Sequence, residues 1–174
     1  MQSLTSYAVK ENDKRIFHDV AWLISTELRA VGIDLNFAPV LDIDESKSSI
    51  IGDRAFSKNV NEVIEFSSLY IGGMHEAGMK STGKHFPGHG GVYEDSHLEL
   101  VEDQRSLEDL LHEDIKPYSE LKDKLDVIMC AHVLFPEVDK KLPSYSKIWL
   151  EDILRDKLQY KGLIFSDDLS MKGS

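Results

Sequence analysis

The sequence predicts an α/β fold built around a parallel sheet, of the (β/α)₈ barrel type. Four segments with helical periodicity alternate strictly with four short apolar segments, and this order is typical of a parallel sheet covered by helices. The apolar segments are hydrophobic on both faces, as expected for strands buried on both sides. Polar residues follow their ends, where barrel enzymes carry their chemistry. These residues are Asp42, Lys84, His85, His132, Asp167 and Asp168.

The first helix is predicted over residues 13–31, where apolar residues recur at spacings of three and four. They are Ile16, Val20, Leu23, Ile24, Leu28 and Val31. Gly32 is expected to end this helix, because glycine readily adopts the left-handed conformation of a C-cap. Residues 33–38, in the run IDLNFAPVLDI, then predict a strand. It is expected to end near Pro39, which has no backbone N–H to donate.

The second helix is predicted to begin at Asn59. Asn59 and Glu62 have the spacing of a capping box, in which each residue satisfies a backbone N–H of the other. An apolar stripe over residues 63–74 continues the helix towards Gly78. Residues 79–84 then predict a short strand, which is the second of the sheet.

Two more helix–strand units complete the alternation. The third helix is predicted over residues 106–124, kinked or restarted at Pro117 because proline disrupts a helix interior. The strand after it is predicted over residues 127–132 and is almost entirely apolar. The fourth helix is predicted over residues 146–159 and the fourth strand over residues 163–166.

Two architectures fit this alternation, a doubly wound open sheet and a (β/α)₈ barrel. No glycine-rich phosphate loop follows a strand, which disfavours the dinucleotide-binding form of the open sheet. A complete barrel needs about 250 residues and eight strands. We therefore expect residues 1–174 to be about half of a catalytic barrel domain, truncated at both ends, with an open core and two unpaired strand edges.

Composition excludes several classes of function. The chain has 174 residues, with 20 Lys and Arg against 31 Asp and Glu, and its net charge of −11 repels a phosphate backbone. No apolar run approaches the roughly 18 residues that cross a membrane. The single cysteine, Cys130, cannot form an internal disulfide, which fits a reducing, cytoplasmic location. It lies in an apolar strand and is predicted to be a core residue rather than a nucleophile.

Residues 84–97, KHFPGHGGVYEDSH, form the segment richest in chemically active side chains. Asp95 and His97 are two residues apart, so in an extended stretch they lie on the same side. A carboxylate beside an imidazole prepares it as a general acid or base; a loop hydrogen bond without catalytic duty is the alternative. His85, His89 and His97 also suggest a metal site, which the absence of the glutamate of zinc hydrolases disfavours.

Two further segments carry candidate residues. In FSDDL, Asp167 and Asp168 follow an apolar strand, where an aspartate can be a nucleophile, a metal ligand or a helix cap. In GDRAF, Arg54 can clamp a hydroxyl or a carboxylate, and an ordinary surface arginine is the alternative. Neither segment alone decides between these interpretations.

Five blocks together resemble glycoside hydrolase family 3, and within it the bacterial β-N-acetylglucosaminidases of peptidoglycan recycling. They are IDLNFAPVLDI, IGDRAFSKN, HEAGMKSTGKHFPGHGGVYEDSH, AHVLFP and YKGLIFSDDLSMKG. The blocks extend over nearly the whole chain in the order of the family. The D-S-H element separates this branch from the β-glucosidases of the family, which take their acid/base from another domain.

The resemblance implies a (β/α)₈ barrel and retaining hydrolysis of terminal β-linked N-acetylglucosamine (GlcNAc) from GlcNAc-1,6-anhydroMurNAc muropeptides. By position, Asp167 matches the catalytic nucleophile, His97 the acid/base and Asp95 its dyad partner. The sugar-binding residues of the family match Arg54, Lys84 and His85. The partner implied is a small carbohydrate, with no nucleic acid, no membrane, no metal and no organic cofactor.

Three alternatives remain at this stage: a broad hexosaminidase, a phosphorylase that uses phosphate in place of water, and an inactive or sugar-binding fragment. The family positions a sugar-binding aspartate and arginine ahead of the residue that matches Met1. We therefore expect the isolated 174 residues to fold poorly or self-associate, and to hydrolyse GlcNAc glycosides slowly or not at all.

Overall fold

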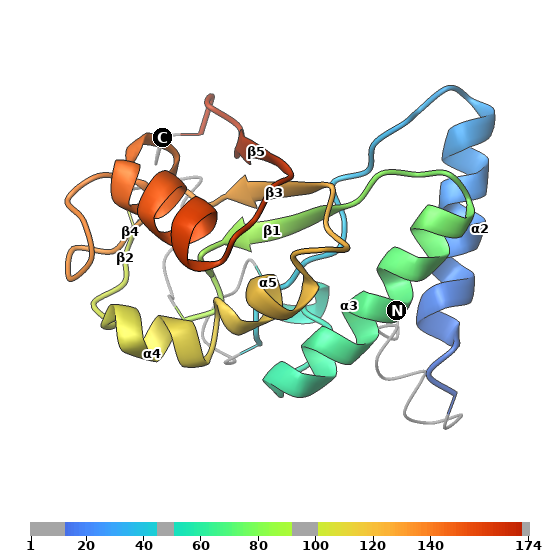
Figure 1. Ribbon diagram of the computed structural model, residues 1–174. Coiled ribbons are helices and arrows are strands. Elements are labelled where there is room, and N and C mark those ends of the chain that lie inside the picture. Colours follow the sequence, from blue (N-terminus) through green and yellow to red (C-terminus); the bar gives the residue numbers. More distant parts are fainter. Residues whose placement is uncertain (1–12, 45–50, 92–100, 172–174) are drawn as a thin grey trace.

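A three-stranded parallel sheet forms the centre of the computed structural model (Figure 1). Its strands are β1 (Thr82–Phe86), β3 (Val127–Cys130) and β5 (Leu163–Ser166), in the order β1-β3-β5. The structure describes residues 13–44, 51–91 and 101–171. Both ladders are parallel, with Thr82 opposite Val127 and Val127 opposite Leu163. The predicted parallel sheet is therefore confirmed.

The strand order distinguishes between the two predicted architectures. Residues 33–43 lie beside β1, which they meet through the parallel bridges Leu35–Lys80 and Val40–Lys84. Along the sheet, the four segments therefore follow one another as they do in the sequence. A doubly wound sheet reverses direction at a switch point, and these four described segments show no reversal. The arrangement is that of a (β/α)₈ barrel.

The first predicted strand is irregular, and this part of the prediction is wrong. Thr82 N donates to Ala38 O at 2.7 Å and Lys84 N to Pro39 O at 3.3 Å, so the carbonyls of this segment do pair with β1. Pro39 has no N–H to return a hydrogen bond, so a regular ladder cannot pass through it. The segment is therefore extended and paired but is not a continuous strand. Strand β1 begins three residues later and ends two residues later than the predicted range of 79–84.

Two helices, α2 (Ile16–Ala30) and α3 (Val60–Glu76), pack against each other at one end of the sheet (Figure 1). Asn59 caps α3, since its side chain accepts from Asn61 N at 2.9 Å and Glu62 N at 3.4 Å. The reciprocal half of the predicted capping box does not form. The Glu62 carboxylate instead accepts from the Ser57 hydroxyl at 2.5 Å.

Gly73 is the point of closest approach between α2 and α3. A Cβ at Gly73 would collide with the His18 carbonyl and lie 3.0 Å from Trp22 N, whereas one at Gly72 would lie 3.6 Å from the His18 ring. We expect Gly73→Ala to force the helices apart and lower the thermal midpoint by several degrees. The matched change Gly72→Ala should be neutral or slightly stabilising, because alanine favours a helix by about 1 kcal/mol over glycine. Thermal unfolding checks both, and equal midpoints would contradict the close approach.

The third predicted helix is two helices, α4 (Leu107–His112) and α5 (Lys116–Leu121). Ser106 and Asp109 form a capping box at the start of α4. Pro117 lies in the first turn of α5, where no backbone N–H is needed, so the predicted restart is confirmed. The fourth helix, η3 (Ile148–Lys157), has the i→i+5 hydrogen bonds of a π-helix rather than an α-helix.

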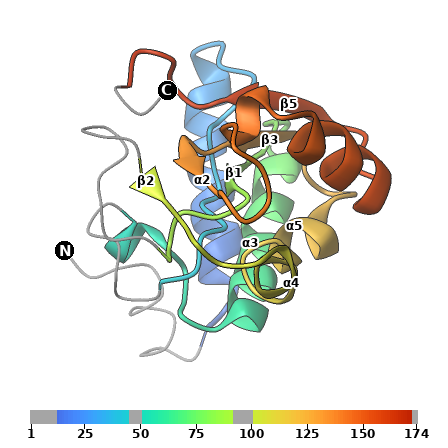
Figure 2. The ribbon, with the colours of Figure 1, turned by 90° about the vertical axis from the view of Figure 1, so that its left-hand side faces the viewer.

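A cluster of buried aromatic rings forms the core between the sheet and these helices. Trp149 makes edge-on contacts with Phe86 and Phe135, at centroid separations of 5.8 and 5.4 Å. Tyr118 approaches Phe86 at 5.2 Å. In both ribbon views η3 lies beside β5 and α5 lies beside the sheet (Figures 1 and 2). This core covers the face of the sheet that carries Ile128 and Cys130, which are both fully buried.

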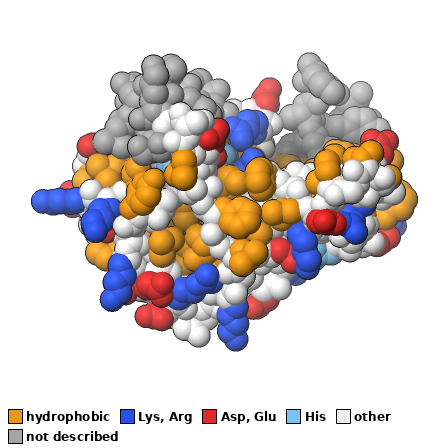
Figure 3. Space-filling view, turned by 90° about the horizontal axis from the view of Figure 1, so that it is seen from above, with side chains coloured by type: hydrophobic (Ala, Val, Ile, Leu, Met, Phe, Trp, Pro, Cys, Tyr) orange, Lys and Arg blue, Asp and Glu red, His pale blue; other side chains and the backbone are white. Residues whose placement is uncertain are grey.

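The opposite face of the sheet is open. Hydrophobic side chains gather in the middle of the surface above β3 and β5 (Figure 3). Phe37 and Leu163 keep 51% and 62% of their surface exposed, and Phe37 meets Phe165 edge-on at 6.5 Å. Because alternate residues of a strand point to opposite faces, Met129 and Phe165 lie on this open side. It is the face that a (β/α)₈ barrel turns inward.

A second, very short sheet was not predicted. It pairs β2 (Val101–Glu102) with β4 (Val133–Leu134) in parallel. The predicted strand over residues 127–132 therefore ends at Cys130, and the chain forms a new pair three residues later. Among the helices in the described part of the chain, none is long and apolar enough to cross a membrane.

Candidate active site

The carboxyl-terminal edge of the sheet collects the predicted site residues that the structure describes. Lys84 and His85 lie in the second half of β1, and Asp167 follows β5 directly. Parallel strands end at the same edge, so residues far apart in sequence meet there. Arg54 reaches the same place from the short helix η1 (Gly52–Arg54). The structure therefore brings together four of the six candidate residues.

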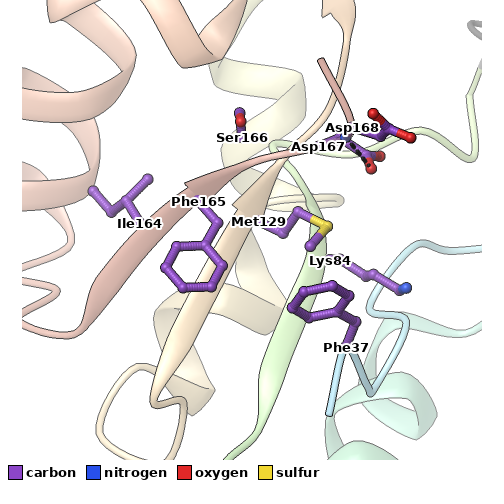
Figure 4. Close-up of a pocket in the computed structure, with 8 residues that line it drawn as sticks. All are labelled: Phe37, Lys84, Met129, Ile164, Phe165, Ser166, Asp167 and Asp168. Carbon is purple, nitrogen blue, oxygen red and sulfur yellow. Dashed lines mark hydrogen bonds between the residues drawn. The ribbon is translucent and has the colours of Figure 1, made fainter. Parts of the chain in front are cut away.

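An open cavity of about 650 Å³ lies at this edge. In Figure 4, Phe37, Met129 and Phe165 form an apolar wall, and Asp167 and Lys84 lie at one end of it. Its complete lining is Phe37, Lys84, Met129, Ile164, Phe165, Ser166, Asp167 and Asp168. An apolar wall with a few charged groups at one end is the usual composition of a small-molecule site.

His85 lies at the centre of the charged groups. Its Nδ1 is 2.7 Å from Asp42 Oδ2. Its Nε2 is 3.5 Å from Arg54 Nη2 and 4.0 Å from Asp167 Oδ2. One imidazole thus links a buried carboxylate to the arginine and to the aspartate of the cavity.

Asp42 is a residue whose role the sequence did not suggest, beyond its place after a predicted strand. It is 1% exposed. Its Oδ1 accepts from His89 N at 2.8 Å, and both oxygens lie 3.3 Å from His85 N. Burial would raise the pKa of Asp42, but the attraction of His85 and His89 outweighs burial and lowers the pKa. Asp42 is therefore a buried carboxylate at neutral pH.

Lys84 is a half-buried cation in the same cavity. Burial lowers its pKa and the Arg54 guanidinium lowers it further, while the carboxylates of Asp167 and Asp42 oppose both effects. Two cations that repel each other beside a carboxylate favour the binding of electron-rich oxygens. Sugar hydroxyls and carbonyls are ligands of this kind.

Asp167 and Asp168 have different surroundings. Asp167 N donates to Cys130 O at 3.0 Å, so the β3–β5 ladder extends to this residue. Its Oδ1 accepts from Asp168 N at 2.8 Å. Asp168 is exposed, and its Oδ1 accepts from Ser170 N at 2.8 Å. Of the pair, Asp167 is the residue whose carboxylate faces His85, and Asp168 closes the following turn.

The glycine-rich segment after β1 packs too closely for side chains. A Cβ at Gly90 would collide with the Ile43 carbonyl, and one at Gly88 would lie 2.6 Å from Asp114 Cβ. Asp114 belongs to a buried ion cluster in which Arg105 Nη1 donates to its carboxylate at 2.6 Å. The predicted pair of Asp95 and His97 lies outside the described residues.

The remaining predictions concern metal binding and Cys130. Within the described ranges, no three His, Cys, Asp or Glu side chains group as metal ligands. Burial lowers the pKa of His89 despite the attraction of Asp42. Cys130 is fully buried, and burial raises the pKa of its thiol to about 12. It is therefore a core residue, as predicted.

Known proteins resemble this chain in both sequence and structure. The model of the glycosyl hydrolase family 3 N-terminal domain matches residues 2–174. The chain belongs to glycoside hydrolase family 3. The family-3 fold is the TIM-barrel-type α/β fold that the alternation predicted and the sheet order shows.

The relatives of this family-3 chain include proteins named β-hexosaminidase. The protein of Idiomarina loihiensis is 51% identical over 174 residues, which are all of this chain and 52% of that protein. The protein of Pseudomonas aeruginosa strain PAO1 is 44% identical over the same length and share. The chain thus spans about half the length of these curated relatives.

Solved structures of family 3 agree. Native NagZ from Neisseria gonorrhoeae superposes with a TM-score of 0.91 at 43% identity, covering 97% of this chain and 51% of that one. The same protein has been solved with N-trifluoroacetyl-D-glucosamine, with the same scores. The β-glucoside phosphorylase BglX has a TM-score of 0.89 at 26% identity, covering 93% of this chain and 32% of that one.

Proposed function

We propose that this family-3 chain supplies the nucleophile and sugar-binding residues of a retaining β-N-acetylglucosaminidase. The observation that carries the proposal is the position of Asp167 at the end of β5, with its carboxylate 4.0 Å from His85 Nε2 in the cavity that Lys84 lines. The relatives named β-hexosaminidase and the N-trifluoroacetyl-D-glucosamine complex of NagZ support GlcNAc as the sugar.

In this proposal Asp167 attacks the anomeric carbon of the sugar and the glycosidic bond breaks. His97, oriented by Asp95, gives its proton to the departing oxygen. Water then attacks the glycosyl–Asp167 ester, with His97 taking the proton of that water, so the carboxylate and the imidazolium are both restored. Arg54, Lys84 and His85 hold the sugar hydroxyls. All reacting groups are side chains, so no metal or organic cofactor is required.

The substrate that fits best is a small soluble glycoside with a terminal β-linked GlcNAc. We assign the muropeptide GlcNAc-1,6-anhydroMurNAc to this role, which places the reaction in peptidoglycan recycling in the cytoplasm. The assignment rests on the five sequence blocks shared with that branch of the family and on the 44–51% identity to proteins named β-hexosaminidase.

Phosphorolysis is the second candidate, because the chain is also similar in structure to a β-glucoside phosphorylase. In that reaction phosphate replaces water and the product is a sugar 1-phosphate. The test is to incubate the full-length protein with 4-nitrophenyl β-GlcNAc, and with the matching β-glucoside, with and without phosphate. We expect free GlcNAc in both buffers and little release from the glucoside. GlcNAc 1-phosphate as the main product would replace hydrolysis by phosphorolysis.

The acid/base assignment has its own test. His97→Ala should slow turnover and flatten its pH dependence, because the group that protonates the leaving oxygen is lost. Substrates with a good leaving group need less protonation, so the loss should be smaller for 4-nitrophenyl β-GlcNAc than for a disaccharide. An equal loss for both substrates would contradict the role of His97.

A further inference from the structure

We propose that Asp42 is a positioning residue of the active site, which fixes the tautomer and orientation of His85. The proposal rests on the proposed function for its consequences in catalysis, but its structural basis is independent. No part of that function assigns Asp42 a role. Asp42 lies on the Nδ1 side of the imidazole and does not line the cavity, whereas Arg54 and Asp167 approach the Nε2 side.

The carboxylate of Asp42 accepts hydrogen bonds from both ends of the backbone segment 85–89. Oδ2 meets His85 Nδ1 at 2.7 Å and Oδ1 meets His89 N at 2.8 Å, while His85 N lies 3.3 Å from both oxygens. Asp42 therefore contacts both ends of residues 85–89. A fully buried carboxylate with three N–H donors around it has little freedom to move.

The chemistry of these contacts determines where His85 carries its proton. A carboxylate only accepts hydrogen bonds, so His85 Nδ1 must be the protonated nitrogen. In neutral His85 the other nitrogen, Nε2, then keeps its lone pair and accepts from Arg54 Nη2 at 3.5 Å. This contact is at the long limit of a hydrogen bond, so a sugar hydroxyl can replace Arg54 as the donor to Nε2. If Nε2 carried the proton instead, it would face the N–H groups of Arg54.

Asp42→Asn keeps the volume of the side chain but removes its charge and one of its two acceptor oxygens. An amide has one acceptor oxygen, so its NH₂ must meet either His85 Nδ1–H or a backbone N–H of residues 85–89. If the NH₂ meets Nδ1–H, His85 relieves the clash by moving its proton to Nε2, the wrong tautomer for the site; if it meets His89 N–H, the backbone of residues 85–89 must shift. Misplacing a tautomer in an analogous aspartate–histidine pair of another enzyme costs about 10⁴-fold in kcat. We expect a loss of kcat/KM of about 100-fold or more here.

A double-mutant cycle tests whether Asp42 acts through His85. In the full-length protein, Asp42→Asn should cost about 100-fold or more in the wild-type background, but less than about tenfold when His85 is already alanine. Losses that multiply in the double variant would overturn the proposal. Asp44→Asn is the matched control. Asp44 lies two residues further along the chain, and its Oδ2 is 4.0 Å from Nζ of the exposed Lys58. It should retain wild-type activity.

The pH profile gives a second measurement that a purely structural role would not change. The groups facing Asp42 are His85, His89, Lys84 and Tyr118. Removing the charge of Asp42 removes the attraction that partly offsets the burial of His89, so the pKa of His89 falls further. Protonation of this histidine then requires a lower pH, and the acidic limb of kcat/KM should move to lower pH in Asp42→Asn. An unchanged limb would count against the proposal.

The tautomer can be read directly, without a variant and without activity. In protein labelled with ¹⁵N-histidine, the nitrogen shifts of neutral His85 should show a protonated Nδ1 and an unprotonated Nε2. A proton on Nε2 alone would overturn the proposal even if hydrolysis proceeds as proposed. Conversely, a correct tautomer in a protein that does not release GlcNAc would leave Asp42 in its role and remove the proposed function.

Discussion

Asp167→Ala is expected to abolish measurable GlcNAc release, lowering kcat by roughly 10⁴-fold or more. The proposed reaction forms a covalent bond to the Asp167 carboxylate, and no other described carboxylate of the cavity faces His85. Without it the sugar has no nucleophile on that side. Initial rates on 4-nitrophenyl β-GlcNAc in the full-length protein measure the loss.

Three controls separate a lost nucleophile from a damaged site. Azide added to Asp167→Ala should restore turnover and give a glycosyl azide of inverted configuration, because the small anion enters the vacated side. A 2-fluoro or 5-fluoro sugar should label Asp167 in the wild-type protein. Asp168→Asn should lose less than tenfold, because this exposed carboxylate accepts from Ser170 N in the turn that follows β5. Label on any other residue would contradict the assignment.

Trp149→Ala is expected to have the largest effect on stability, lowering the free energy of unfolding by about 3–5 kcal/mol. Trp149 is fully buried and packs edge-on against Phe86 and Phe135. Truncation would leave a cavity among these rings that the rest of the core cannot close. Because Phe86 is the last residue of β1, the loss would also loosen the strand that carries Lys84 and His85.

Trp22→Ala on α2 makes the same chemical change at a side chain that is 41% exposed. It should cost less than about 1 kcal/mol, as most surface changes do. Urea unfolding followed by circular dichroism compares the two variants with the wild-type protein. Similar midpoints for Trp149→Ala and Trp22→Ala would show that the aromatic cluster is not the centre of the core.

Periodicity predicted the existence and approximate bounds of the long helices α2 and α3, but not the buried face of α2. Leu23 and Ile24 of the predicted apolar stripe are exposed, and the buried residues of α2 are Phe17, Ala21 and Ser25. Periodicity also failed where backbone hydrogen bonding depends on a partner distant in sequence. Residues 33–38 have a strand pattern, but the ladder to β1 is interrupted because Pro39 lacks a donor. Strands β2 and β4 have two residues each, too few to show any alternation. Nor does a pattern of apolar residues distinguish the i→i+5 bonds of η3 from those of an α-helix.

The site was predicted in part, and for a physical reason. Strand ends predicted that Lys84, His85 and Asp167 would meet, because parallel strands share a carboxyl-terminal edge. Asp42 was on the same edge but carried no motif of its own in the sequence. Its role depends on burial and on three N–H groups from the segment after Lys84, which only the folded chain brings to it.

The opposite, amino-terminal edge of the sheet has a chemistry of its own. There Asp126 accepts from His75 at 2.8 Å, from Lys80 at 2.8 Å and from Ser81 N at 3.0 Å, which joins the end of α3 to the start of β3. These contacts are separated from Asp167 by the length of the strands. A substitution at the edge around Asp126 can therefore change the stability of the sheet without altering the contacts of His85 and Asp167 at the other edge.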